Sequence, residues 1–199
     1  MPRVVDGEAR RAELAAATRR VVLRRGMEGV TLRHVAQEAG WSIGILQHYF
    51  KSKDDLLRYS IADPAWVEAQ IASVRAGGQP TLRSLLTQVL PTTDAMRSMW
   101  WIWMAFWVWR PGDPAWEAER LERQRRFRRW CTRLVADAQA AGALPANLAP
   151  GAEGDRLAVL IHGLSVEAVL DPGDWPPEKQ HAVLDEHLAR LRVGGAAAK

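Results

Sequence analysis

Four residues in the first quarter of the chain are spaced so that they could read the edges of DNA bases: Ser42, Gly44, Gln47 and His48. The amide of Gln47 can form a bidentate pair with adenine, and His48 can reach a base edge or a phosphate. Gly44 lacks a side chain that could obstruct close approach to the groove. A solvated helical face without a ligand is the alternative explanation for these residues.

Two short helices joined by a glycine turn are predicted to position these side chains. Thr31 is a favourable N-cap because its hydroxyl can accept from an unpaired helix N–H, and apolar residues then recur at helical spacing up to Ala39. Gly40 ends this helix, since glycine adopts the left-handed C′ conformation at little cost. Ser42 caps the next helix, expected over residues 43–49. Such a pair of helices places its second helix in the major groove of DNA.

This segment resembles the DNA-binding domain of the TetR family of repressors over about the first sixty residues. The matching residues are Thr31-Leu32, Val35-Ala36, Ala39-Gly40, Ser42, Gly44, Leu46, Tyr49-Phe50 and Lys51-Ser52-Lys53. The resemblance implies an all-helical homodimer with a ligand-binding C-terminal domain. It also implies phosphate contacts from Thr31, Tyr49 and Lys53, which fix register rather than sequence. The full set of residues expected at the DNA is Thr31, Arg33, Ser42, Ile43, Gly44, Gln47, His48, Tyr49 and Lys53.

The formal charge of +4 is confined to the same end of the chain. Residues 1–58 carry eleven Lys/Arg and seven Asp/Glu, whereas residues 59–199 carry sixteen of each. An excess of positive charge on the segment with the helix-turn-helix pattern indicates a polyanionic partner. Ordinary variation in charge is the alternative.

A tryptophan-rich helix is predicted over residues 93–109, where Trp100, Trp103, Met104 and Trp107 form one helical stripe. Aromatic walls suit flat or cationic ligands because ring faces attract cations. A core of large side chains is the alternative. With one tryptophan from each of two neighbouring helices, the expected ligand residues are Trp66, Trp100, Trp103, Met104, Trp107 and Trp130.

Residues 103–107 and 184–191 resemble the choline-responsive BetI-like branch of the family. No acidic residue lies on the tryptophan stripe, so we expect a larger hydrophobic or aromatic ligand in preference to choline.

The remaining periodicity predicts an all-α fold, with a DNA-binding domain over residues 1–51 and a ligand-binding and dimerisation domain over residues 52–199. Helices are expected over 8–25, from Ser52 to a break at Asp63-Pro64, from Thr81 to near Pro91, and over 113–141, 155–170 and 178–192, with a loop over 143–154. The last two helices are expected to form a dimer interface with their symmetry mates. Its residues are Leu157, Leu160, Ile161, Leu164, Leu184, Leu188 and Leu191, although these leucine-rich stripes could equally pack on the protein's own core.

Several classes of protein are not expected. Cys131 is the only cysteine, which leaves no intrachain disulfide. The apolar run 99–109 is shorter than the roughly 20 residues of a membrane span, and the first residues lack a signal core. A soluble cytoplasmic protein without membrane contact is therefore expected. The histidines lack metal-ligand spacing, and no nucleotide-binding or hydrolase motif occurs, so we expect no enzyme, cofactor or metal.

The predicted function is a ligand-responsive transcriptional regulator, a repressor released from a palindromic operator by a small hydrophobic, aromatic or cationic molecule. Its partners would be double-stranded operator DNA, the effector and a second copy of the chain. The alternative is a helical small-molecule-binding protein or enzyme whose N-terminal helix-turn-helix is purely structural.

Overall fold

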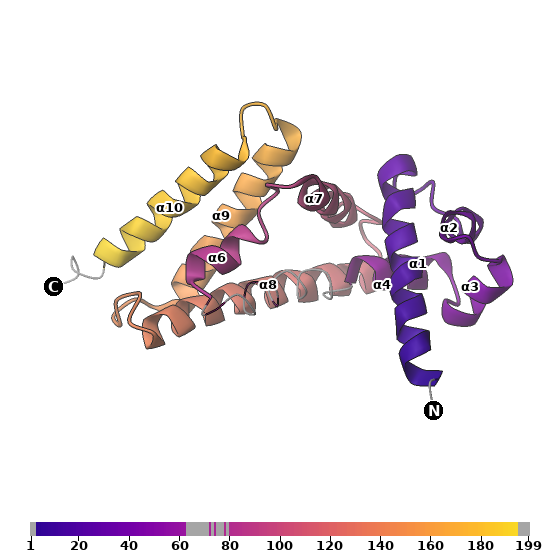
Figure 1. Ribbon diagram of the computed structural model, residues 1–199, viewed down its shortest axis with the longest axis horizontal. Coiled ribbons are helices and arrows are strands. Elements are labelled where there is room, and N and C mark those ends of the chain that lie inside the picture. Colours follow the sequence, from indigo (N-terminus) through magenta and orange to yellow (C-terminus); the bar gives the residue numbers. More distant parts are fainter. Residues whose placement is uncertain (1–2, 63–71, 73, 75–77, 79, 195–199) are drawn as a thin grey trace. The chain divides into compact units, whose positions relative to one another are not determined.

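The computed structural model describes residues 3–62, 72, 74, 78 and 80–194, and every regular element within those ranges is an α-helix (Figure 1). The predicted all-α class is therefore confirmed. The expected break at Pro64 and the helix expected around Trp66 lie outside the described residues. None of the described helices is long and apolar enough to cross a membrane.

The chain divides into two compact units. The first consists of residues 1–64 with 101–111, and the second of residues 65–100 with 112–199. The domain boundary expected from the sequence, between residues 51 and 52, stays a prediction. Helix α7 contributes residues to both units, because the division falls between Trp100 and Trp101.

Four whole helices and the second half of α7 belong to the first unit. The whole helices are α1 (Arg3–Arg25), α2 (Leu32–Ala39), α3 (Ile43–Tyr49) and α4 (Lys53–Ala62). Helix α1 packs against both α2 and α4, and α2 packs against α3. The first helix was expected from Glu8, and α1 begins five residues earlier, at Arg3.

The predicted caps hold the two short helices of this unit. The Thr31 hydroxyl accepts from the His34 N–H at 3.1 Å, and the Ser42 hydroxyl accepts from the Ile45 N–H at 3.3 Å. Between them Gly40 has a φ of 72°, the left-handed conformation that ends α2. Each cap satisfies a backbone group that the helix itself leaves unpaired.

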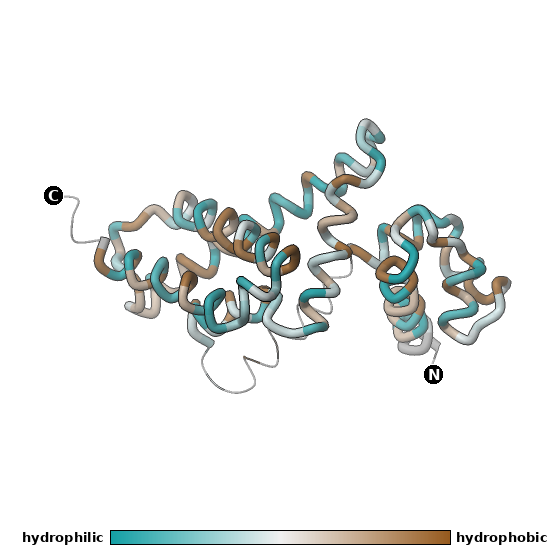
Figure 2. The backbone as a smooth tube through the Cα atoms, turned by 90° about the horizontal axis from the view of Figure 1, so that it is seen from above, coloured by the Kyte–Doolittle hydropathy of each residue, from teal (hydrophilic) through white to brown (hydrophobic). Residues whose placement is uncertain are grey.

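Apolar side chains from all four helices fill the interior of the first unit. Figure 2 shows how hydrophobic and hydrophilic positions alternate along the chain. Each large aliphatic side chain taken from water stabilises the fold by about 1.5–3 kcal/mol, so this interior fixes where the short helices lie. The buried set includes Leu14, Ala17, Val21, Val35, Leu46, Phe50, Leu56, Leu57 and Ile61.

The second unit is built on two long helices. Its elements are α6 (Leu82–Thr87), the first half of α7 (Asp94–Trp107), α8 (Pro114–Ala140), α9 (Pro150–Leu170) and α10 (Pro177–Gly194). Helix α8 packs along α9, and α10 lies beside α9 and α6 (Figure 1). Helix α6 is shorter than expected, because after Thr87 the backbone continues as tighter turns, in which the N–H of Leu90 donates to the carbonyl of Thr87.

The loop expected over residues 143–154 is only partly correct. Helix α9 starts at Pro150 and has Gly151 and Gly154 within it. Proline is favourable in the first turn of a helix, where its missing N–H is not needed, so the Pro/Gly/Ala composition of this segment did not exclude a helix.

Helix α9 approaches α8 closely at Gly154. A Cβ atom at this position would lie 2.5 Å from the Thr132 hydroxyl oxygen and 2.7 Å from the Thr132 Cα. Because one of these atoms belongs to the backbone of α8, the contact cannot be relieved by rotating a side chain. The glycine therefore sets the spacing between the two longest helices of the second unit.

We predict that Gly154→Ala lowers the free energy of unfolding by about 1–3 kcal/mol, the usual cost of overpacking a core. Chemical denaturation followed by circular dichroism measures this change. Gly151→Ala is the matched control, because a Cβ at Gly151 meets nothing within 4 Å. Alanine favours helix over glycine by about 1 kcal/mol, so the control should be neutral or slightly stabilising. Equal behaviour of the two variants would contradict the close contact.

Candidate DNA-binding and effector sites

Helix α3 presents a polar face to solvent. Ser42, Gly44, Gln47 and His48 are all exposed, while Leu46 points into the core of the first unit. The polar groups that could contact bases therefore lie together on the outside of a helix whose other side is anchored.

Ile45 is a candidate that the sequence analysis missed. It is one of the few large apolar side chains exposed in the first unit, and it lies on the same short helix as Gln47 and His48. An apolar side chain at this place can contact the methyl group of thymine in the major groove. The sequence indicates that Ile45 belongs to the helix that Ser42 caps, but it does not indicate that the Ile45 side chain is exposed.

The other residues expected at the DNA differ in exposure. Thr31 and Arg33 are exposed, and the half-buried Ile43 and Tyr49 lie at the two ends of α3. The Tyr49 ring lies edge-on to His48, with 5.2 Å between ring centroids, and the Tyr49 carbonyl accepts from the Arg11 guanidinium at 3.1 Å. These contacts fix the end of α3 against α1.

Trp41, in the turn, is half-buried and packs at the same place. Its ring lies 6.2 Å from that of Tyr49, and the Arg10 guanidinium of α1 lies 6.0 Å from its centroid. The turn is thus braced by aromatic and cation–π contacts within the unit.

Lys53 contacts other parts of the first unit. Its ammonium donates to the Glu28 carbonyl at 3.0 Å and lies 5.4 Å from the centre of the Trp109 ring. Next to it, Arg110 pairs with Asp54 at 2.6 Å. Lys53, an expected phosphate-contacting residue, and Asp54 therefore also connect the start of α4 to Trp109 and Arg110, more than fifty residues away. Lys51 is exposed at the end of α3 and is a second cation there.

The arginines of α1 are partly neutralised. Arg20 and Arg24 both bind the Glu38 carboxylate, at 2.6 Å for Arg20. These hydrogen bonds lower the pKa of Glu38, so it remains a carboxylate at neutral pH. Because the pair is exposed, its main role is to orient α2 on α1 rather than to add stability.

The residues of the expected tryptophan stripe differ in their surroundings. Trp100 is 1% exposed, and its indole N–H donates to the Val89 carbonyl at 2.8 Å. A satisfied, fully buried indole is a packed core residue. Trp103, Met104 and Trp107 are half-buried and belong to the first unit, whereas Trp66 lies outside the described residues.

Within the second unit, Trp100 and Trp130 belong to one aromatic cluster with two residues that the sequence analysis did not name. Phe127 lies 5.6 Å from Trp130 and 4.8 Å from His162, and His162 lies 5.8 Å from Trp100. Burial lowers the pKa of His162 to about 4. The imidazole is therefore neutral at neutral pH and contributes an uncharged ring to the cluster.

Most of the residues expected at the dimer interface are buried within one chain. Six of the seven, all except Leu160, are buried in a single chain: Leu157, Ile161, Leu164, Leu184, Leu188 and Leu191. They form the core between α9, α10 and their neighbours. That the same stripes also contact a second copy stays a prediction. Leu160 is half-buried. Apolar periodicity identifies the buried stripe of a helix, but the first partner of that stripe is the chain itself.

Metal and thiol chemistry have no counterpart in the described residues. No group of three His, Cys, Asp or Glu side chains there could hold a metal ion. Cys131 is buried, and burial raises the pKa of its thiol to about 12. A thiol in that state is a small hydrophobic side chain rather than a nucleophile.

Comparison with known proteins shows which class this geometry belongs to. Residues 14–59 match the family described as bacterial regulatory proteins, tetR family, and residues 79–193 match the BetI-type transcriptional repressor C-terminal family. The HTH-type transcriptional regulator PksA of Bacillus subtilis is 31% identical over 199 residues, covering 97% of this chain and 95% of that protein. The regulator BetI of Burkholderia lata is 36% identical over 179 residues, covering 87% and 89%.

A solved structure has the same fold. It is a putative transcriptional regulator from Saccharomonospora viridis in complex with choline, with a TM-score of 0.72 and 20% identity, covering 92% of this chain and 96% of that one. Fold and sequence together define a helix-turn-helix DNA-binding transcriptional regulator. The chain belongs to the TetR family, with a C-terminal part of the BetI type.

Proposed function

We propose that this regulator is a repressor that binds a palindromic operator as a homodimer and releases it when a small hydrophobic or aromatic molecule binds. The observation that carries the DNA part is the exposed polar face of α3, which is held by two caps and a buried core. We also propose that it acts in the cytoplasm and that it is not an enzyme.

The proposed DNA contacts divide into two kinds. Ile45, Gln47 and His48 are the candidates for base contacts, because all three are exposed on α3. An α-helix fits into the major groove of DNA. Thr31, Arg33, Tyr49, Lys51 and Lys53 are the candidates for phosphate contacts. Phosphate contacts act on any DNA sequence and weaken with salt, whereas base contacts decide which sequence is preferred.

The proposed dimer interface is the outer face of α9 and α10. Three apolar side chains on these helices are exposed in the single chain: Val159 is 73% exposed, Leu170 60% and Val193 72%. Gly163 lies on the same side of α9 as Val159 and is exposed, and a Cβ atom added there would meet nothing within 4 Å. A two-fold related copy of the same face would cover these residues.

The proposed effector site is the half-buried part of the tryptophan stripe. Trp103, Met104 and Trp107 are partly accessible, in contrast to the packed Trp100. The Saccharomonospora viridis regulator, which shares the fold, was solved in complex with choline. A cation of that kind is a candidate here, but the stripe carries no carboxylate, so we propose an aromatic effector.

We predict that Gln47→Ala relaxes preference at one operator position by about 1–3 kcal/mol and leaves binding to random DNA unchanged. Lys51→Ala should instead weaken binding to both DNAs. It should also reduce the slope of the logarithm of the binding constant against the logarithm of the salt concentration by about one in magnitude. Mobility shifts with the DNA upstream of the protein's own gene and with random DNA measure both effects. Lys179→Ala, on α10, is the control lysine. If wild type binds no DNA more tightly than random sequence, the alternative of a purely structural helix-turn-helix is correct.

We predict that Val159→Glu raises the dimer dissociation constant at least about tenfold, because the substitution would bury an unpaired charge. Sedimentation equilibrium of the full chain measures the assembly, and a mobility shift measures the accompanying loss of operator binding. Leu121→Glu is the control, since Leu121 is an exposed leucine on α8. A wild-type chain that is monomeric at micromolar concentration would rule out this interface.

We predict that 2-naphthol and benzyltrimethylammonium release operator DNA at lower concentration than choline does, because only the first two carry an aromatic ring for the stripe. Trp103→Ala should weaken their binding about tenfold or more by calorimetry. Trp101→Ala is the control on the same helix, because Trp101 is 48% exposed. Unchanged binding to the Trp103 variant would show that the effector site lies elsewhere.

A further inference from the structure

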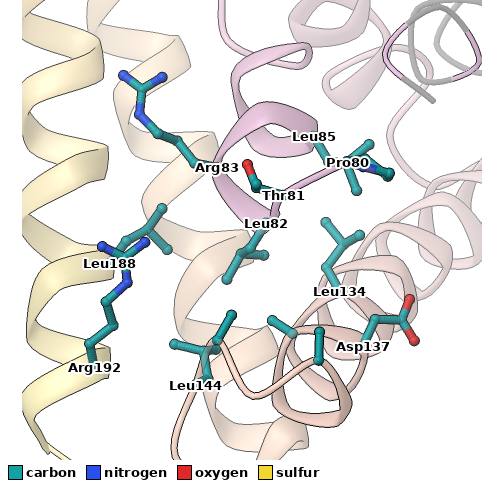
Figure 3. Close-up of a pocket in the computed structure, with 13 residues that line it drawn as sticks. Pro80, Thr81, Leu82, Arg83, Leu85, Leu134, Asp137, Leu144, Leu188 and Arg192 are labelled. Carbon is teal, nitrogen blue, oxygen red and sulfur yellow. The ribbon is translucent and has the colours of Figure 1, made fainter. Parts of the chain in front are cut away.

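The second unit contains a cavity of about 290 Å³ that is separate from the aromatic cluster. It is bounded by the start of α6, the end of α8 with the loop that follows, and the last turns of α10 (Figure 3). Cavities that hold small molecules start at about 300 Å³, so this one suits a compact ligand.

The walls of the cavity are mostly aliphatic. Leu85, Leu134, Leu144 and Leu188 are largely buried and yet line this space. Leu82 of α6 is drawn between them in the close-up (Figure 3). An apolar body placed here would be removed from water on several sides, which is favourable in proportion to the area covered.

One rim of the cavity carries an excess of positive charge. Arg83 binds Asp185 through two hydrogen bonds, of 2.5 and 2.9 Å. Arg192 also lines the cavity, and its charge acts on the same carboxylate, contributing to the lowered pKa of Asp185 after the larger effect of the Arg83 hydrogen bonds. This rim therefore carries two guanidinium groups and one carboxylate, which is bound by Arg83 alone, and so has one positive charge in excess. Asp137 lies across the cavity with its carboxylate directed away from it (Figure 3).

Arg192 is the group best placed to accept a further anion. It is exposed on α10, and no salt bridge to it is formed within the part of the chain that the structure describes. A guanidinium binds a carboxylate through two parallel hydrogen bonds. The site thus combines an apolar body with one cationic edge.

We propose that this cavity binds a small amphipathic monocarboxylate, with its carboxylate on Arg192 beside the Arg83–Asp185 pair and its hydrocarbon chain against the leucines. This site is additional to the proposed effector site on α7. It does not depend on the proposed function, because binding is measured without DNA.

Calorimetry of the full chain with octanoate, octan-1-ol and octyltrimethylammonium tests the proposal. Octanoate should bind saturably with one site per chain, at least about tenfold more tightly than octan-1-ol, and octyltrimethylammonium should bind most weakly. No saturable octanoate binding would overturn the proposal. Tighter binding of octyltrimethylammonium would also overturn it, because Asp137 rather than Arg192 would then decide the charge preference.

Two pairs of variants locate the site. Arg192→Gln should weaken octanoate about tenfold and leave octan-1-ol unchanged, whereas Arg190→Gln, two residues away and paired with Glu186, should change neither. Ala141→Phe should fill the cavity and abolish binding of both probes, whereas Ala140→Phe, in the same turn but not among the residues that line the cavity, should not. Thermal unfolding confirms that each variant is folded. Equal effects of either variant and its control would place octanoate elsewhere and overturn the proposal.

Discussion

A helix of seven residues does not hold its shape in water, and the proposed DNA-contacting surface is built on one. Isolated helices shorter than about 12–15 residues are marginal even with favourable sequences. Helices α2 and α3, with eight and seven residues, therefore depend on their caps and on burial against α1. Burial of Leu46, within α3, and of Phe50, just after it, holds the polar face of α3 in place. The requirement to anchor a short recognition helix explains most features of the first unit.

Local interactions made this part of the protein predictable from sequence. Thr31, Gly40 and Ser42 act on backbone groups within three or four residues of themselves, so their spacing alone indicates where α2 ends and α3 begins. The same holds for the stop of α1 at Gly26, whose φ is 68°. The start of α9 was harder to predict, because Pro150 and Gly154 are compatible with either a loop or a helix until the contact with α8 is known.

Contacts between distant segments could not be predicted in this way. The leucine stripes of α9 and α10 were correctly recognised as apolar faces, but their period does not say whether a second copy or the same chain covers them. The exposed Val159 and Val193 carry no stronger signal in the sequence than the buried Leu157 and Leu191. Similarly, the stacking of His162 on Phe127 joins α8 and α9, and nothing near either residue indicates the other.

The segment from Trp101 to Pro111 has a consequence for how this protein could be divided or recombined. Trp109 and Arg110 contact Lys53 and Asp54 at the start of α4, so the compact unit that carries the recognition helix is completed by residues from much further along the chain. The DNA-binding half is therefore not a portable module. A chimera that joins residues 1–64 to a foreign ligand-binding domain would have to supply an equivalent of this returning segment.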